Sequence, residues 1–112
     1  MLVARDYSFW VYIVGSVHDR VLYIGVTKSL SRRISEHRNA RLEGFTSKYR
    51  CRKLLYYEQY DYVDDALARE TQIKKWSRSK KNALIWRTNP AWSDLAPSIL
   101  GEDTEMSRLR ST

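Results

Sequence analysis

Two stretches near the N-terminus are apolar at almost every position. Residues 8–15 and 21–26 are rich in Val, Ile, Tyr and Trp, and the short, turn-like segment SVHDR separates them. Because β-branched and aromatic residues favour strands, this pattern predicts an antiparallel hairpin. Both strands are apolar on both faces, so we expect a sheet that is covered on each side.

From Ser29 onward, the spacing of the apolar residues is that of a helix rather than a strand. This serine can cap a helix, and Leu30 and Ile34 give that helix a narrow apolar stripe. Residues 44–50 are polar, contain glycine and lack a period, so we expect a loop there. Residues 53–60 then predict a third strand.

Two further helices are expected after this strand. Asp64 or Asp65 is positioned to cap a helix that runs through Trp76. Ser77 or Ser79 is positioned to begin a second helix. It should fade before the Asn-Pro pair at residues 89–90, because a proline disfavours helical backbone at the preceding residue.

The element order is therefore β-β-α-β-α-α, which predicts a compact α/β sandwich on a three-stranded, mostly antiparallel sheet. At 112 residues the chain is long enough for one core, so we expect one domain over residues 1–92. Residues 93–112 contain proline, glycine and mixed charges without a period, and we expect a loosely ordered tail there.

Charge narrows the class of partner. Lys and Arg outnumber Asp and Glu by 20 to 13, which gives a net charge of +7, and the excess gathers in residues 32–53 and 69–87. Such a surface favours polyanions such as nucleic acid or an anionic membrane, and the alternative is an ordinary solvated charged face.

Cys51 is the only cysteine, which excludes an intrachain disulfide and a metal site built on several thiolates. The longest apolar run, residues 9–14, is far shorter than the ~20 residues that span a bilayer. We therefore expect a cytoplasmic protein without a membrane partner.

Two tyrosines of the hairpin are candidates for chemistry. If Ser16 pairs with Asp19, then Tyr12 lies directly opposite Tyr23 and both rings project from one face. The alternative is a structural aromatic pair in the core. A slip of one residue in register would place the rings on opposite faces.

Arg33 and His37 lie one helical turn apart, so they share a face of the first helix. Arginine offers a charged fork for phosphate oxygens, and imidazole can move a proton near neutral pH. Taken singly, each is most often an ordinary surface residue.

Glu70 is more unusual, because it emerges from an apolar helical stripe that contains Ala66, Leu67 and Ile73. A carboxylate in that position needs a cation, a metal or an edge that reaches water. A salt bridge to one of the many arginines is the competing explanation.

Together these residues resemble the GIY-YIG nuclease family, and the whole chain resembles its small, stand-alone bacterial branch. The VYI at residues 11–13 and the YIG at residues 23–25 are similar to the two signature strands. The remaining family positions follow in the expected order as Arg33, His37, Glu70 and Asn82.

The resemblance implies a metal-dependent endonuclease that hydrolyses phosphodiester bonds in DNA, in repair or recombination. Glu70 would hold one Mg²⁺ or Mn²⁺. Arg33 would bind a phosphate oxygen, and Tyr12 or Tyr23 would take a proton from water, with help from His37 or a metal-bound hydroxide. Such a phenol needs a cation or a metal that lowers its pKa.

Asn82 completes the catalytic set that the resemblance implies. The implied partner is nucleic acid, DNA in the first place, and a homodimer would suit a module with one site. Two alternatives remain open: a nucleic-acid-binding module of the same fold that no longer cuts, and a basic protein–protein adaptor.

Overall fold

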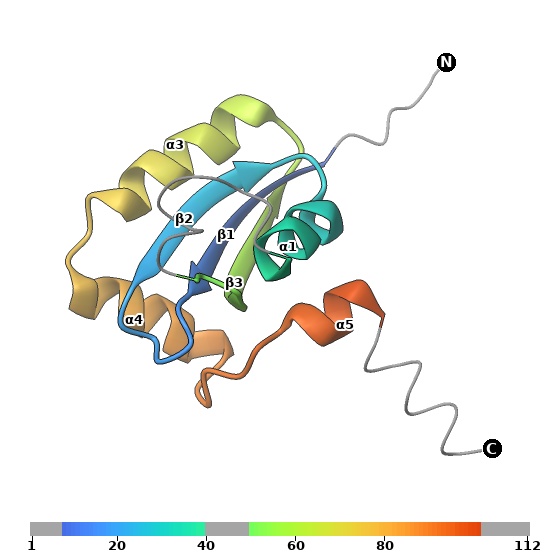
Figure 1. The fold of residues 1–112 in the computed structure, drawn as a ribbon. Coiled ribbons are helices and arrows are strands. Elements are labelled where there is room, and N and C mark those ends of the chain that lie inside the picture. The colour runs from blue at the N-terminus through green and yellow to red at the C-terminus, as the bar shows by residue number, and fades with distance from the viewer. Residues whose placement is uncertain (1–7, 40–49, 102–112) are drawn as a thin grey trace.

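The computed structural model describes residues 8–39 and 50–101, so most of the predicted loop, residues 44–49, lies outside the described part. The elements in chain order are β1 (Phe9–Gly15), β2 (Leu22–Thr27), α1 (Leu30–Arg38), β3 (Lys53–Tyr60), α3 (Val63–Lys74), α4 (Arg78–Thr88) and α5 (Ala96–Leu100) (Figure 1). None of the helices in these segments is long and apolar enough to cross a membrane.

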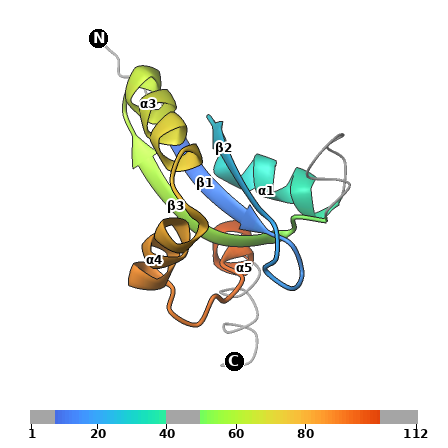
Figure 2. The same cartoon turned by 90° about the vertical axis from the view of Figure 1, so that its left-hand side faces the viewer.

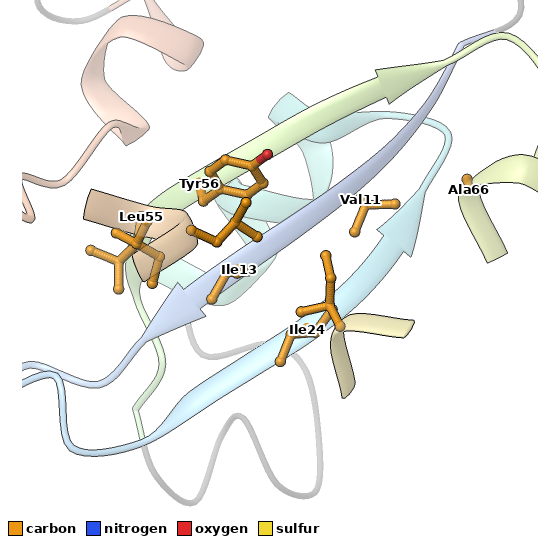
Figure 3. Packing of buried hydrophobic residues seen from close by; sticks show 9 residues of the cluster. Val11, Ile13, Ile24, Leu55, Tyr56 and Ala66 are labelled. Carbon is orange, nitrogen blue, oxygen red and sulfur yellow. The ribbon is translucent and has the colours of Figure 1, made fainter. Parts of the chain in front are cut away.

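The three strands form one antiparallel sheet in the order β2-β1-β3. Helices α3 and α4 cover one face, and α1 and α5 cover the other (Figure 2). Alternate residues of β1 enter the two cores, so that Val11 and Ile13 face α3 and α4 (Figure 3) while Tyr12 and Val14 face α1. The predicted fold class and the sheet covered on both sides are therefore confirmed.

The register of the hairpin differs from the prediction by two residues. Tyr12 is opposite Gly25, and Tyr23 is opposite Val14. The backbone N–H of Ser16 donates to the carbonyl of Val21 at 2.9 Å, so the turn is longer than the one predicted. Because side chains alternate with a period of two, this shift still leaves both tyrosines on one face of the sheet.

The capping predictions are confirmed at two of three helices. The hydroxyl of Ser29 accepts from the N–H of Arg32, and that of Ser77 accepts from the N–H of Lys80. Both serines satisfy donors that the first helical turn leaves free. The predicted third strand also has the observed bounds, residues 53–60.

Helix α3 begins two or three residues earlier than predicted, at Val63, and it ends at Lys74 rather than at Trp76. Its N-cap is Tyr62, and Asp64 and Asp65 lie inside the first turn, so the prediction that one of them caps the helix is wrong. Their charges still suit the positive end of the helix dipole. Leu67 is 45% exposed, which also corrects its place in the predicted buried stripe.

A carboxylate network fastens α3 to β3. Glu58 of β3 accepts from Arg69 of α3, with its oxygens 3.0 Å from Nε and 2.9 Å from Nη2. The hydroxyls of Tyr56 and Tyr60 also donate to Glu58. This network sets the position of the helix that carries Glu70.

Part of the predicted loose tail is an ordered segment. The N–H of Leu95 donates to the carbonyl of Leu54 at 2.8 Å, and the carboxylate of Asp94 accepts from the N–H groups of Leu54 and Ala96. This segment is therefore hydrogen-bonded to β3, and α5 packs against the core on the face of the sheet that α1 covers. Residues 102–112 lie outside the described part, and the domain boundary stays a prediction.

Candidate active site

The ring of Tyr12 lies across the neighbouring strand at Gly25. A Cβ atom added to Gly25 would lie 2.5 Å from the hydroxyl oxygen of Tyr12 and 2.6 Å from its Cζ. Any other residue would therefore displace the ring. Glycine at this position lets the phenol of β1 reach over the edge strand β2.

Tyr12 is joined there by Tyr23 of β2 and His37 of α1. The hydroxyl of Tyr12 and Nε2 of His37 are hydrogen-bonded at 3.2 Å, and the Tyr23 ring centroid lies 6.4 Å from that of Tyr12 and 5.9 Å from that of His37. Nδ1 of His37 is buried and forms no hydrogen bond within the described residues, although the backbone of Cys51 is near enough to raise the pKa of the imidazole. The three rings form one cluster, which we call the ring cluster.

Burial controls the protonation of this cluster. Tyr12 is 2% exposed, and burial, with the neighbouring Tyr23, raises the pKa of its hydroxyl well above the usual value. Burial, and then the charge of Arg33, lowers the pKa of His37 to about 4, against the opposing charge of Glu36. At neutral pH both members of the pair are therefore uncharged.

Arg33 supplies the positive charge beside the ring cluster. It is close enough to lower the pKa values of both Tyr12 and His37, and its side chain is 38% exposed. Its Nε lies 3.6 Å from a carboxylate oxygen of Glu36, which also pairs with Arg32 at 3.5 Å. The guanidinium is thus held near the rings while part of it faces solvent.

Glu36 is a site residue that the sequence analysis missed. A signal was present, because Glu36 lies three positions after Arg33 on the same helix and such pairs meet on one face.

Glu70 approaches from the other layer of the fold. Helix α3 packs against β1 and β2, and the Glu70 charge contributes to the raised pKa of Tyr12. The Glu70 side chain is 18% exposed, and its carboxylate forms an ion pair with Lys74 at 3.1 Å. The ion-pair partner of Glu70 is thus a lysine of the next turn rather than one of the arginines, and the carboxylate remains within electrostatic reach of the phenol.

Asn82 belongs to a different set of contacts. Its side-chain oxygen accepts from Nε of Arg78 at 2.8 Å, and Arg78 donates in turn to the carbonyls of Asp19 and Arg20 in the β1–β2 turn. The structure therefore brings Tyr12, Tyr23, Arg33 and His37 together with Glu70 in reach, and it places Asn82 beside the turn.

Residues 8–83 match the family model described as the GIY-YIG catalytic domain. The chain belongs to the GIY-YIG family. A GIY-YIG domain is a nuclease-type hydrolase domain, so nucleic acid is the class of substrate.

Several relatives share most of the chain. A UPF0213 protein of Staphylococcus saprophyticus is 40% identical over 76 residues, which are 68% of this chain and 92% of the relative. A UPF0213 protein of Syntrophus aciditrophicus is 38% identical over 82 residues, which are 72% and 92% of the two chains.

A solved structure has the same fold. The solution NMR structure of a UPF0213 protein from Bacillus halodurans matches with a TM-score of 0.50 at 24% sequence identity, and the match covers 80% of this chain and 95% of that one.

GIY-YIG nucleases generally use divalent metals. No group of three or more His, Cys, Asp or Glu side chains gathers within residues 8–39 and 50–101. Mg²⁺, however, is commonly bound by one or two carboxylates and keeps several waters. The partly exposed carboxylate of Glu70 fits that need, whereas a site made of several protein ligands does not fit these residues.

Proposed function

We propose that the protein is a metal-dependent endonuclease that hydrolyses phosphodiester bonds in DNA, with repair or recombination as the setting that the resemblance implies. The observation that carries the proposal is the buried pair of Tyr12 and His37 beside the partly exposed Arg33, with the Glu70 carboxylate in electrostatic reach. These groups supply a proton path, an anion site and a hard metal ligand.

Arg33 is the group that we assign to the phosphate. Its contact to Glu36 is long, at 3.6 Å, and a guanidinium binds phosphate oxygens in a two-pronged manner. A bound phosphate would also offset the positive charge that depresses the pKa of His37. Substrate binding would then make His37 a better proton acceptor at the moment when one is needed.

Tyr12 is the group that we assign to the water. Its raised pKa disfavours a free phenolate, so we propose a relay rather than an ionised base. The phenol oxygen takes a proton from water while its own proton passes to Nε2 of His37, in the tautomer with hydrogen on Nδ1. The hydroxide attacks phosphorus, the P–O bond to the leaving group breaks, and the departing oxygen takes a proton from solvent.

Glu70 is the group that we assign to the metal. A divalent ion, Mg²⁺ or Mn²⁺, would supply positive charge where the phosphate becomes more negative. The Glu70 carboxylate would exchange its ion pair with Lys74 for that ion. Tyr23 packs against both rings of the relay and is the second candidate for the base. Asn82 has no role in the proposal, because its hydrogen bond to Arg78 ties it to the turn.

The proposal is tested by incubating the protein with labelled single-stranded, duplex and branched DNA, and with RNA, in Mg²⁺ or Mn²⁺. Tyr12→Phe should lower the cleavage rate by about 10²-fold or more, as loss of a proton-transfer group does. Tyr62→Phe is the matched control, because Tyr62 is 71% exposed. Absence of cleavage under every condition, or equal rates for the wild type and Tyr12→Phe, would rule the proposal out.

A nucleic-acid-binding module that does not cut is the second candidate. The observation that favours it is the protonation of the ring cluster, since the pKa shifts of Tyr12 and His37 both oppose their use as ready bases. This candidate predicts salt-dependent affinity for DNA without cleavage in any metal.

A further inference from the structure

A groove of about 650 Å³ opens beside Arg33. It lies where the start of β1, the end of β2 and the first turns of α1 and α3 meet. Its apolar lining is Phe9, Val26 and Val63, and its cations are Lys28, Arg32 and Arg33.

The charges of the groove favour an anionic occupant. The three cations face one acidic lining residue, Glu36, and that carboxylate already pairs with two of them, Arg32 and Arg33. Arg32 is highly exposed, with 80% of its side-chain surface open to solvent. The rim can therefore follow a phosphate backbone beyond the single phosphate that Arg33 would bind.

The apolar side chains of the groove do not suit a phosphate, so they need an apolar part of the ligand. Val63 is 42% exposed, and Phe9 and Val26 are only partly buried. Nucleobases offer apolar faces to aromatic and aliphatic side chains, and the groove has the size typical of sites for small ligands.

The corner of the groove is fixed before any ligand arrives. The hydroxyl of Thr27 donates to the carbonyl of Ser29 at 3.2 Å and accepts from its N–H at 3.1 Å. The end of β2 and the start of α1 are thus locked together, which holds the cations of α1 against the apolar wall.

We propose that this groove is a nucleoside subsite, which takes the base next to the phosphate that Arg33 contacts. The inference rests on the proposed nuclease function and adds the class of substrate to it. A base can enter only if it leaves its stack and its partner. The preferred substrate is therefore DNA in which a nucleotide beside the cut is unpaired or easily unstacked.

The test fills the groove from an exposed position. Val63→Trp places a large ring in the groove, and Val63→Glu places a negative charge there. Val63 is the first residue of α3, where a glutamate suits the helix dipole, so the second variant keeps the fold even if the first does not. Val17→Trp is the matched control, because Val17 is 57% exposed and lies in the β1–β2 turn.

The probe is a DNA oligonucleotide with 2-aminopurine placed in turn at each position beside the cut, bound in EDTA so that no cleavage occurs. With wild type and Val17→Trp, one position should change its fluorescence on binding. Val63→Trp and Val63→Glu should abolish that change and weaken binding by roughly tenfold or more.

An abasic nucleotide at the same position should lower the cleavage rate by a similar factor. The protein could cut DNA while both Val63 variants bind as the wild type does and the abasic strand is cut as fast as the intact one. In that case the subsite is wrong and the nuclease function stands. If the protein neither binds nor cuts any of these strands, both proposals fall.

Discussion

The hydroxyl of Tyr12 lies 3.2 Å from Nε2 of His37, although one residue comes from the central strand and the other from a helix that covers the sheet. The pair is buried, uncharged at neutral pH and adjacent to the charge of Arg33. The pKa of His37 therefore depends on the charge of Arg33.

Replacing Arg33 should raise the pKa of His37. The Arg33 charge is the second cause of the lowered value, after burial, so Arg33→Gln should move the His37 pKa upward from about 4 while burial keeps it below 6.5. The measurement is an NMR titration of the His37 ring protons. Arg32→Gln is the control, because it removes the same charge from an arginine whose side chain is 80% exposed and which is not among the groups that shift the pKa of His37. An unchanged or lower pKa in Arg33→Gln would contradict the placement of the guanidinium.

His37 should also make the stability of the fold depend on pH. Its pKa is lower in the folded protein than the ordinary 6.5, so the unfolded chain binds its proton first. Protonation of His37 therefore does not lower the free energy of unfolding above pH 6.5. As the pH falls from 6.5 to 4, it should lower that free energy by up to about 3 kcal/mol.

Urea unfolding at pH 7 and pH 4 measures this loss. Other groups titrate in the same range, so the informative quantity is the difference between wild type and His37→Gln. That variant should lose less stability on acidification, whereas His18→Gln should behave as wild type because His18 is exposed. Equal losses in wild type and His37→Gln would be incompatible with a buried, neutral imidazole.

Gly25→Ala should impair cleavage through Tyr12. The new Cβ would lie 2.5 Å from the Tyr12 hydroxyl, so the ring must move and its hydrogen bond to His37 must lengthen. We expect a loss of about 10²-fold in cleavage rate, as misplaced catalytic groups produce, and about 1–3 kcal/mol of unfolding free energy.

Gly15→Ala separates these two effects. A Cβ there would crowd Leu55 at 2.7 Å, in the core and away from the ring cluster. It should therefore lower the unfolding free energy while cleavage by the folded protein persists. Equal loss of cleavage in both variants would mean that the position of Tyr12 is not the cause.

Arg69→Ala should lower the stability of the fold, because Arg69 is the cation of the network that joins α3 to β3. Burial raises the pKa of the Glu58 carboxyl. Hydrogen bonds from Arg69, Tyr56 and Tyr60 outweigh burial and hold this pKa below its usual value. Removing Arg69 leaves this carboxylate without its cation, which should lower the unfolding free energy by about 3 kcal/mol. Denaturant unfolding measures the loss, with Arg87→Ala on the exposed surface of α4 as control. A change below about 0.5 kcal/mol would show that the network is not stabilising.

The sequence predicts those parts of the fold that depend on neighbours along the chain. Residues 53–60 form the expected strand, and Ser29 and Ser77 cap the expected helices. Each of these depends on a local pattern or on a hydrogen bond within one turn. The register of the hairpin was missed because the backbone N–H groups of residues 20 and 21 donate to the hydroxyl oxygen of Ser16, and these hydrogen bonds determine where the turn closes.

Contacts between distant segments were harder to foresee. Asp94 and Leu95 bond to Leu54 across a long stretch of chain, and no period marks that pairing. The protonation of the site is similar. A cation beside Tyr12 was expected to lower the pKa of its phenol, and Arg33 does act in that direction, but burial outweighs it. Only the packed structure shows which effect is larger.

The most direct test of the account is the single-turnover cleavage rate of Glu70→Gln beside Asp64→Asn, in Mg²⁺ and in Mn²⁺. Both substitutions remove one carboxylate from α3, but only Glu70 is in reach of Tyr12, and Asp64 is exposed in the first turn. The account predicts metal-dependent cleavage by wild type and Asp64→Asn, and a loss of at least about 10²-fold in Glu70→Gln. Equal rates for the two variants, or undiminished cleavage in EDTA, would contradict it.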